Sequence, residues 1–468
     1  MKKAVRIITL LLAVAMVCTA LVGCGGGGNT DTQQTPDGPK EINLGGKAIK
    51  VAAWWNPMPR EDAATEKERL QALQYKEAME KYNFTVEEIV TEQIEVKSKF
   101  EAAQMAGDAW ADIVTMRAEQ ADVFAANGSL LAMNDLYNFD SPDNEYNQQV
   151  RERFTINGKT YAFSYDIYWL ENILIFNKDI LDSVGLPYPY ELAANKEWTW
   201  DKFEEYVKKC TKRESDGYVV HYGVYGSAET GAVDNWVVSA INKSMLYFEN
   251  GKVVNGINDP EYINMVNRAR DLFNSEYSLM PNKGTETWRD KPAKFLNGKV
   301  AFYSTSMAGG TDSLNEADTD INWGIVTMPS LKAGEDFHRC SGTINVKVMP
   351  AALSKDMEWA KNVAFVYEQI YKSPYAPEER EAKIIEELET KLPDPQSVEI
   401  VKKYQYDYPV TLFGKYVLDD SVFYPSVEVP FQEAMRGENT IGNAVGTFKD
   451  VLQGLVDNYN SSTTTKVE

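Results

Sequence analysis

Histidine, cysteine and clustered positive charge are scarce in this chain. Its 468 residues include two His and four Cys, and neither a Cys-x-x-Cys pair nor a His-Glu-x-x-His motif occurs, which excludes most zinc sites. Lys and Arg number 48 against 69 Asp and Glu, for a formal net charge of −21. This acidic balance, with no Lys/Arg cluster, argues against nucleic acid as a partner. We therefore expect no metal, no cofactor and no nucleic acid.

Motifs of several enzyme classes are also missing. The sequence has no Gly-x-Ser-x-Gly elbow, and the glycine run at 25–28 lacks the Lys that follows a phosphate-binding loop. Paired carboxylates remain a possible route to glycosidic-bond cleavage, because 69 acidic residues make chance pairs unavoidable. A surface scaffold would usually show internal repeats, and none is visible. We expect no catalytic residues and keep a glycoside hydrolase as the alternative.

The composition is that of a folded protein that is rich in aromatic residues. Hydrophobic residues make up 44% and charged residues 25% of the chain, which are globular proportions. The length is enough for two or three domains. Ten Trp and 26 Tyr supply flat apolar rings of the kind that sugar-binding sites use.

The first residues form a targeting segment. Lys2, Lys3 and Arg6 precede an apolar run over 7–22, which ends in Gly23-Cys24. A small residue directly before Cys at this place resembles the bacterial lipobox, which implies cleavage of a signal peptide at 1–23 and lipidation of Cys24. An ordinary signal peptide with an accidental Cys is the alternative.

A flexible tether is expected to follow over 24–44. It opens with four glycines and continues with polar residues, a composition typical of flexible linkers. Acyl chains on Cys24 would hold the protein to the outer face of the cell membrane. Of the remaining cysteines, Cys210 and Cys340 are predicted either to form a disulfide or to stay as two thiols, and the sequence leaves this open.

Strand and helix patterns alternate in the first part of the chain. Strands are predicted over 47–53, 84–90 and 112–116, and the segments between and after them carry apolar residues at helical spacing. This alternation indicates parallel βαβ units. Further helices are predicted after Thr199, which has the character of an N-cap, over 354–371 and from 441 to the C-terminal end. The Pro-spaced stretch 373–425 is read as either helical or irregular.

Several segments together resemble one family of transport proteins. Residues 198–203 read Trp-Thr-Trp-Asp-Lys-Phe, and 295–302 read Phe-Leu-Asn-Gly-Lys-Val-Ala-Phe. With 105–114, 124–136, 161–163, 174–179, 323–329 and 354–371, they resemble, in order and spacing, the extracellular solute-binding proteins of bacterial ABC importers, especially their sugar-binding group, similar to maltose-binding protein.

The resemblance implies an α/β protein with the type II periplasmic-binding-protein-like fold, in which a hinge joins two lobes. By analogy, lobe 1 would hold 45–166 and 303–352, and lobe 2 would hold 170–300 and 358–468. The implied function of this monomer is to capture a carbohydrate, with an oligosaccharide expected, in a cleft between the lobes and to deliver it to a permease. Peptides and polyols are the alternative solutes.

Candidate ligand-binding residues follow from the ends of the predicted strands. Ligands of open α/β sheets lie beyond the carboxyl ends of the strands. This rule selects Trp54, Trp55 and Asn56 after the first strand, and Arg117 and Glu119 after the third. Trp54 and Trp55 face opposite ways in an extended chain, so one is expected to meet ligand while the other packs inward.

The resemblance adds a second set of site residues. It implies ligand contacts from Tyr165 and Asp166 at the first crossover, and from Trp236 as a stacking ring on lobe 2, with a core Trp as the alternative. Ser306 and Gly309 lie in a small-residue turn where the family often has a Trp that this chain lacks. Gly342 would meet the cleft from the last crossing strand.

Overall fold

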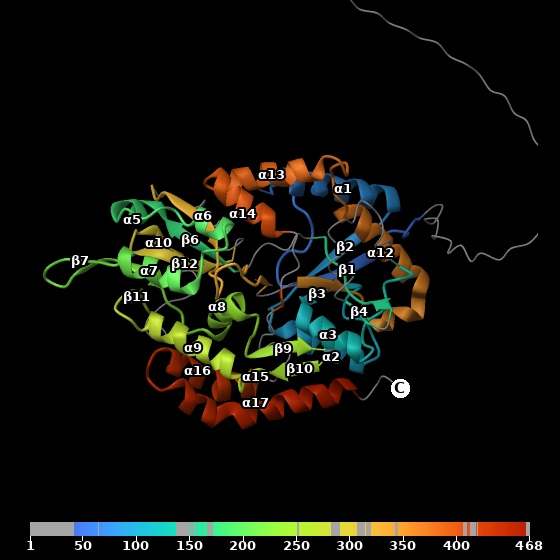
Figure 1. Cartoon of the computed structure of the whole chain (residues 1–468). Helices are drawn as coiled ribbons and strands as arrows, with labels where there is room; N and C mark the ends of the chain where they lie inside the picture. The colour runs from blue at the N-terminus through green and yellow to red at the C-terminus, as the bar shows by residue number, and fades with distance from the viewer. Residues whose placement is uncertain are drawn as a thin grey trace, which may run out of the picture. The chain divides into compact units, whose positions relative to one another are not determined.

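The helices and strands described here come from a computed structural model of the chain (Figure 1). It describes residues 42–63, 65–136, 151, 154–156, 158–165, 172–249, 252–281, 291–306, 314, 320–341, 345–405, 410–411, 418 and 420–464. The predicted signal peptide at 1–23, Cys24 and nearly all of the predicted tether lie outside these residues. Every element below belongs to the unit formed by residues 43–468.

The first sheet is four-stranded and mostly parallel. Its strands are β1 (Ala48–Ala53), β2 (Thr85–Val90), β3 (Ile113–Arg117) and β15 (Asn345–Val348), in the order β15-β3-β1-β2. Strand β1 runs parallel to β2 and β3, and β15 runs antiparallel to β3. The helices α1 (Glu66–Tyr82) and α2 (Glu95–Met105) connect the parallel strands. The predicted βαβ units are therefore confirmed.

Local sequence explains where these connecting helices begin and end. Thr65 caps α1, because its Oγ1 accepts from the Glu68 N–H at 3.2 Å while the Glu68 carboxylate accepts from the Thr65 N–H at 3.3 Å. Asn83 then ends the helix in the left-handed region, with φ of 51°. Gly107, with φ of 71°, lies just beyond the end of α2.

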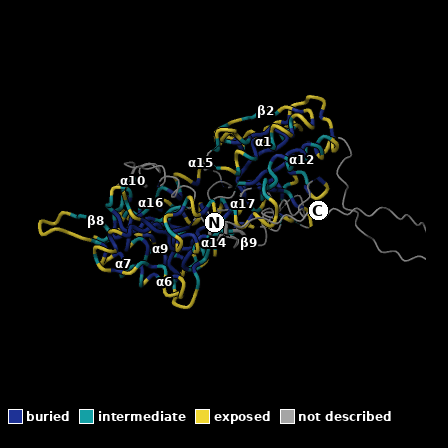
Figure 2. Tube along the Cα trace, turned by 90° about the horizontal axis from the view of Figure 1, so that it is seen from above, coloured by how far each residue is buried: buried dark blue, intermediate teal, exposed yellow. Residues whose placement is uncertain are grey.

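The second sheet mixes parallel and antiparallel strands. It contains β6 (Ile173–Asn177), β8 (Val219–Tyr225), β11 (Ser278–Leu279), β12 (Val300–Thr305) and β13 (Trp323–Thr327), in the order β11-β8-β12-β6-β13. Strand β6 runs antiparallel to both β12 and β13. The hairpin between β7 (Lys212–Arg213) and β8 is exposed at its turn and extends away from the sheet (Figures 1 and 2).

Helices from both halves of the chain pack with the second sheet. Thr199 caps α7, since its Oγ1 accepts from the Lys202 N–H at 3.3 Å, which confirms the predicted N-cap. The stretch that the sequence left open is helical over 380–391 and 395–405. The helices of this part are α5 (Lys178–Ser183), α6 (Tyr190–Ala194), α7 (Trp200–Cys210), α8 (Thr230–Ile241), α9 (Pro260–Phe273), α10 (Lys291–Leu296), α13 (Arg380–Lys391), α14 (Pro395–Gln405), α15 (Asp420–Phe423), α16 (Val429–Met435) and α17 (Ile441–Thr464).

The remaining elements are shorter or belong with the first sheet. They are α3 (Ala118–Ala126), α12 (Met357–Tyr371), the 3-10 turn η2 (Ala351–Asp356), the π-helical turn η4 (Tyr424–Glu428) and the short strands β4 (Thr155–Ile156), β5 (Lys159–Thr160), β9 (Leu246–Glu249), β10 (Lys252–Asn255), β14 (Cys340–Ser341) and β16 (Val410–Thr411). None of the described helices is both long and apolar enough to cross a membrane.

Two of the predicted lobe boundaries are wrong. The prediction gave 303–352 to lobe 1, but β13 pairs with β6 from Trp323 opposite Asn177 to Thr327 opposite Ile173, so it belongs to the second sheet. Within 303–352, β15 is the strand that pairs with the first sheet. The prediction gave 358–468 to lobe 2, but α12 packs on α1, with the rings of Phe365 and Tyr82 5.6 Å apart.

Cysteine chemistry is settled at one position. Cys210 ends α7 as a free, buried thiol, and burial raises its pKa to about 12. Of the two alternatives that the sequence left open, the structure therefore has the thiol at Cys210. The side chain of Cys340 lies outside the described part of the chain.

The carboxyl group of Asp234 lies inside the core that packs on the second sheet. Asp234 on α8 is 4% exposed, and its carboxyl accepts from the Tyr262 hydroxyl at 2.7 Å and the Met245 N–H at 3.4 Å. Burial disfavours the charged form and raises the pKa of Asp234 to about 7, against the two hydrogen bonds, which lower it. The side chain of Asp234 is thus structural.

We predict that Asp234→Asn flattens the pH dependence of stability. An unfolded Asp loses its proton near pH 4, whereas the folded protein holds this proton to about pH 7. Because the folded state binds more protons between these values, the free energy of unfolding falls as pH rises through this window. The variant should gain stability over the parent at pH 8 relative to pH 4.5, by up to about 3 kcal/mol. Urea denaturation at both pH values measures the free energy of unfolding of each protein. An equal change between the two pH values in parent and variant would contradict this prediction.

Candidate functional site

A cavity of about 630 Å³ opens beyond the end of β1. The segment that follows β1 forms one wall, Thr115 of β3 and Lys347 of β15 contribute neighbouring groups, and helices α1, α12 and α13 supply the rest. Its position agrees with the rule that ligands bind beyond the carboxyl ends of parallel strands. The lining residues are Trp55, Asn56, Pro57, Met58, Pro59, Arg60, Asp62, Ala63, Thr65, Lys67, Glu68, Gln71, Thr115, Lys347, Tyr367, Tyr371, Glu387 and Lys391.

Trp54 and Trp55 face different surroundings. Trp55 is 39% exposed and lines the cavity, as does the exposed Asn56. Trp54 is half-buried and packs against the apolar core of the first sheet. The two rings meet edge to face, with centroids 4.8 Å apart. One indole therefore lies at the cavity while the other anchors the segment, as the alternation of an extended chain predicts.

Helix α12 provides a second aromatic wall. Tyr367 and Tyr371 are one helical turn apart, so their rings lie together, with centroids separated by 4.6 Å. The Tyr371 hydroxyl donates to the carbonyl of Pro57, which ties this helix to the segment after β1. Tyr165 stacks on Tyr371 at 5.6 Å and is buried, so it supports the wall and does not line the cavity.

The polar groups of the cavity are close to balanced in charge. Cations and anions both occur, and Glu387 pairs with Lys391 at 2.9 Å on α13. Arg60 makes two hydrogen bonds to Glu88, at 2.9 and 3.0 Å. Lys347 is 6% exposed and is held by two backbone hydrogen bonds with Phe163, at 2.8 and 3.0 Å. Among the described residues, no group of three or more His, Cys, Asp or Glu is placed to hold a metal ion.

Arg117 does not line this cavity. It ends β3 at 8% exposure, its guanidinium donates to Gln93 at 2.9 Å, and its backbone N–H donates to Gln120 at 3.3 Å. These contacts hold Arg117 in the interior at the start of α3. Its position is structural, and it does not make the predicted ligand contact at this cavity. Ser306 is half-buried after β12 and is also not a lining residue. Asp166, Gly309, Gly342 and the side chain of Glu119 lie outside the described residues.

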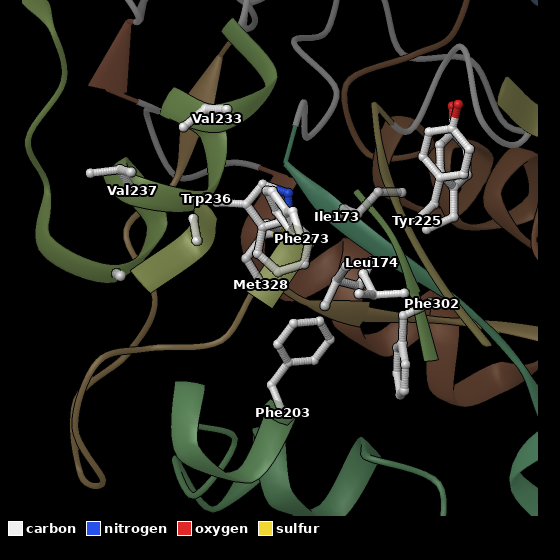
Figure 3. Packing of buried hydrophobic residues seen from close by; sticks show 14 of the residues in the cluster. Ile173, Leu174, Phe203, Tyr225, Val233, Trp236, Val237, Phe273, Phe302 and Met328 are labelled. Carbon is white, nitrogen blue, oxygen red and sulfur yellow. The ribbon is translucent and has the colours of Figure 1, made fainter. Parts of the chain in front are cut away.

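Trp236 occupies the core instead of a ligand site. It is 1% exposed, and its ring lies beside Phe203 and Phe273 (Figure 3), with centroid distances of 5.1 and 5.7 Å. The ring of Trp200 is 5.5 Å away. A ring enclosed in this way has no face for a sugar. The prediction that Trp236 stacks on ligand is therefore wrong in this structure, and the core alternative holds.

Sequence reasoning missed most of the lining groups. Lys347 sits between Val346 and Val348 in an otherwise buried strand, and a Lys in that setting is a usable signal of a special position. Tyr367 and Tyr371 fall beside the apolar stripe of their helix, where the pattern indicates only packing. Thr115, Glu387 and Lys391 carry no local signal, because only the fold brings them to the cavity.

Comparison with known proteins identifies the family. The model of the bacterial extracellular solute-binding protein family matches residues 74–360, more than half of the chain. The chain therefore belongs to this family, whose members bind solutes outside the cell. A comparison with curated proteins found no match.

Solved structures show the same fold at low sequence identity. A cyclo/maltodextrin-binding protein complexed with maltotetraose is 16% identical, with a TM-score of 0.56 over 90% of this chain and 98% of that one. An ABC substrate-binding protein from Listeria monocytogenes in complex with cycloalternan is 18% identical, with a TM-score of 0.57 over 90% of this chain and 100% of that one.

A third solved structure extends the likeness to a polyol-binding protein. An ABC transporter solute-binding protein from Agrobacterium radiobacter in complex with ribitol is 17% identical, with a TM-score of 0.55 over 91% of this chain and 99% of that one. Together with the mixed sheets, these likenesses confirm the predicted fold class, the type II periplasmic-binding-protein-like fold with two α/β lobes.

We predict that Trp236→Ala destabilises the fold. Removing a fully buried Trp leaves a cavity and costs about 3–5 kcal/mol in the free energy of unfolding. Trp55→Ala is the matched control, because its ring is partly exposed and should cost about 1 kcal/mol or less. Chemical denaturation measures both. A Trp236→Ala protein that kept the parent's stability but lost ligand affinity would contradict the core assignment and support a ligand contact by Trp236.

Proposed function

We propose that this protein is the lipid-anchored substrate-binding component of an ABC importer. It acts as a monomer that captures a carbohydrate, chiefly an oligosaccharide, outside the cell and delivers it unchanged to the permease. The observation that carries the proposal is the cavity beyond the end of β1, in which the exposed ring of Trp55 and the half-buried ring of Tyr371 meet polar groups of both charge signs.

The chemistry of the cavity suits a sugar. Pyranose rings present flat C–H faces that pack on indole and phenol rings. Their hydroxyls are both donors and acceptors, and the exposed amide of Asn56 offers groups of both kinds. The lining carries four cations and three anions, and this near balance favours a neutral solute over a strongly charged one. The volume lies within the range of about 300–1,000 Å³ typical of ligand sites.

The solved relatives support this solute class and keep one alternative open. Two of the structures above hold maltotetraose and cycloalternan, both oligosaccharides, and one holds ribitol, a polyol. A polyol would use the same hydroxyl-binding groups with less need of the aromatic rings. The contribution of Trp55 to affinity therefore separates a sugar ligand from a polyol.

We predict that a neutral oligosaccharide raises the melting temperature, because a ligand that binds only the folded state stabilises it. A thermal-shift screen of oligosaccharides and polyols identifies it. Trp55→Ala should then weaken the binding of an oligosaccharide at least about tenfold by calorimetry. Ile94→Ala, which truncates an exposed apolar side chain outside the cavity, is the matched control and should bind normally.

Two outcomes would contradict this proposal. Equal affinities of the parent and Trp55→Ala would remove the aromatic site. Incubation of the protein with the bound oligosaccharide, followed by chromatography, tests the hydrolase alternative, since a receptor must return the sugar uncleaved. Accumulation of shorter products would show an enzyme.

We propose that Cys24 carries the lipid anchor, and the lipobox-like Gly23-Cys24 after the apolar run at 7–22 supports this. We predict that the parent incorporates labelled fatty acid and fractionates with membranes, whereas Cys24→Ser does neither, because the thiol is the point of attachment. Cys210→Ser is the control and should keep the label. A Cys24→Ser protein that still incorporates fatty acid would contradict this assignment.

A further inference from the structure

A second cavity of about 330 Å³ adjoins the first. Thr65, Lys67 and Glu387 line both, so the two spaces meet at the first turn of α1 and the face of α13. The outer cavity, as we name the second one, is lined by Thr65, Glu66, Lys67, Ser373, Tyr375, Arg380, Lys383, Ile384, Glu386, Glu387 and Thr390. Its volume is at the lower end of the range for ligand sites, about 300 Å³.

Specific contacts hold the walls of the outer cavity. Lys383 on α13 pairs with Glu386 at 2.9 Å and reaches Glu66 on α1 at 3.6 Å, which links the two helices. The buried Arg380 donates to the carbonyl of Tyr375 at 3.4 Å. The Tyr375 N–H in turn donates to the Ser373 hydroxyl at 3.3 Å. The wall that carries the Tyr375 ring is therefore fixed by its neighbours.

The outer cavity has the same chemical character as the main one. Glu66, Glu386 and Glu387 face an equal number of cations, which are Lys67, Arg380 and Lys383. A balanced lining favours an uncharged ligand over an anion or a cation. Tyr375 is half-buried, and its ring has the Lys383 ammonium over one face, 5.6 Å from the centroid, which leaves its other face and edge for a ligand. Ser373 and Thr390 offer hydroxyls. These are again groups that pack on and hydrogen-bond to a sugar unit.

We propose that the outer cavity is a second subsite, which binds the distal units of an elongated, uncharged oligosaccharide whose other end lies in the main cavity. This inference rests on the proposed function and adds a preference for chain length. A short sugar fills only the main cavity. A longer one passes the residues that both cavities share and gains contacts with Tyr375 and α13.

Calorimetry with two matched series tests this inference, using maltotriose against maltohexaose and cellotriose against cellohexaose. In the series that binds, the hexasaccharide should bind at least about tenfold more tightly than the trisaccharide. Thr390→Trp places a bulky side chain at an exposed position that lines only the outer cavity. It should abolish this advantage and leave the trisaccharide affinity within about twofold of the parent.

A second variant and a control guard against effects on folding. Tyr375→Ala removes the ring of the outer cavity and should also weaken only the hexasaccharide. Tyr218→Ala removes an equally large ring, 55% exposed in the β7–β8 hairpin and outside both cavities, and should change neither affinity.

The outcomes separate this inference from the proposed function. Equal affinities for the two lengths, or an equal loss of both in Thr390→Trp, would overturn the second subsite while leaving a carbohydrate receptor in place. Failure of all four sugars to bind would contradict the proposed oligosaccharide ligand, and the second subsite with it.

Discussion

The packing of α12 against the first sheet is the constraint on which the candidate site depends. Trp359 at one end of this helix donates to Asp112 at 2.7 Å, and Tyr371 at the other end donates to the carbonyl of Pro57. The helix is thereby held along the sheet, and the segment after β1 is held against the helix. The two aromatic walls of the main cavity are thus parts of one packed unit. Preorganised walls lose little conformational entropy when a ligand binds.

Much of the first sheet could be predicted from the sequence because its signals are local. Short apolar strands, a capping box at Thr65 and a glycine after α2 mark the elements within a few residues of their true bounds. The position of the site followed from these strands, since parallel strands present their carboxyl ends at one edge. Trp55 and Asn56 were found in this way.

Other features depend on distant contacts that a linear pattern does not encode. Trp236 lies in a helix whose sequence is apolar on most faces, and only the packing of Phe203 and Phe273 decides that its ring is enclosed. The assignment of β13 to the second sheet depends on its pairing with β6, about 150 residues earlier in the chain. Glu387 and Lys391 reach the main cavity because α13 lies near α1, a contact marked by the Lys383–Glu66 pair.

The late arrival of β15 has a consequence for how this protein is made. Residues 345–348 supply the edge strand of a sheet whose other strands are complete by residue 117. Synthesis runs from the N-terminus, so more than two hundred further residues are made after β3 before β15 can pair with it. Until then one side of β3 is an open edge, which can pair with other chains. Chaperones that shield such an edge during synthesis and export would therefore be needed most before residues 345–348 have been made.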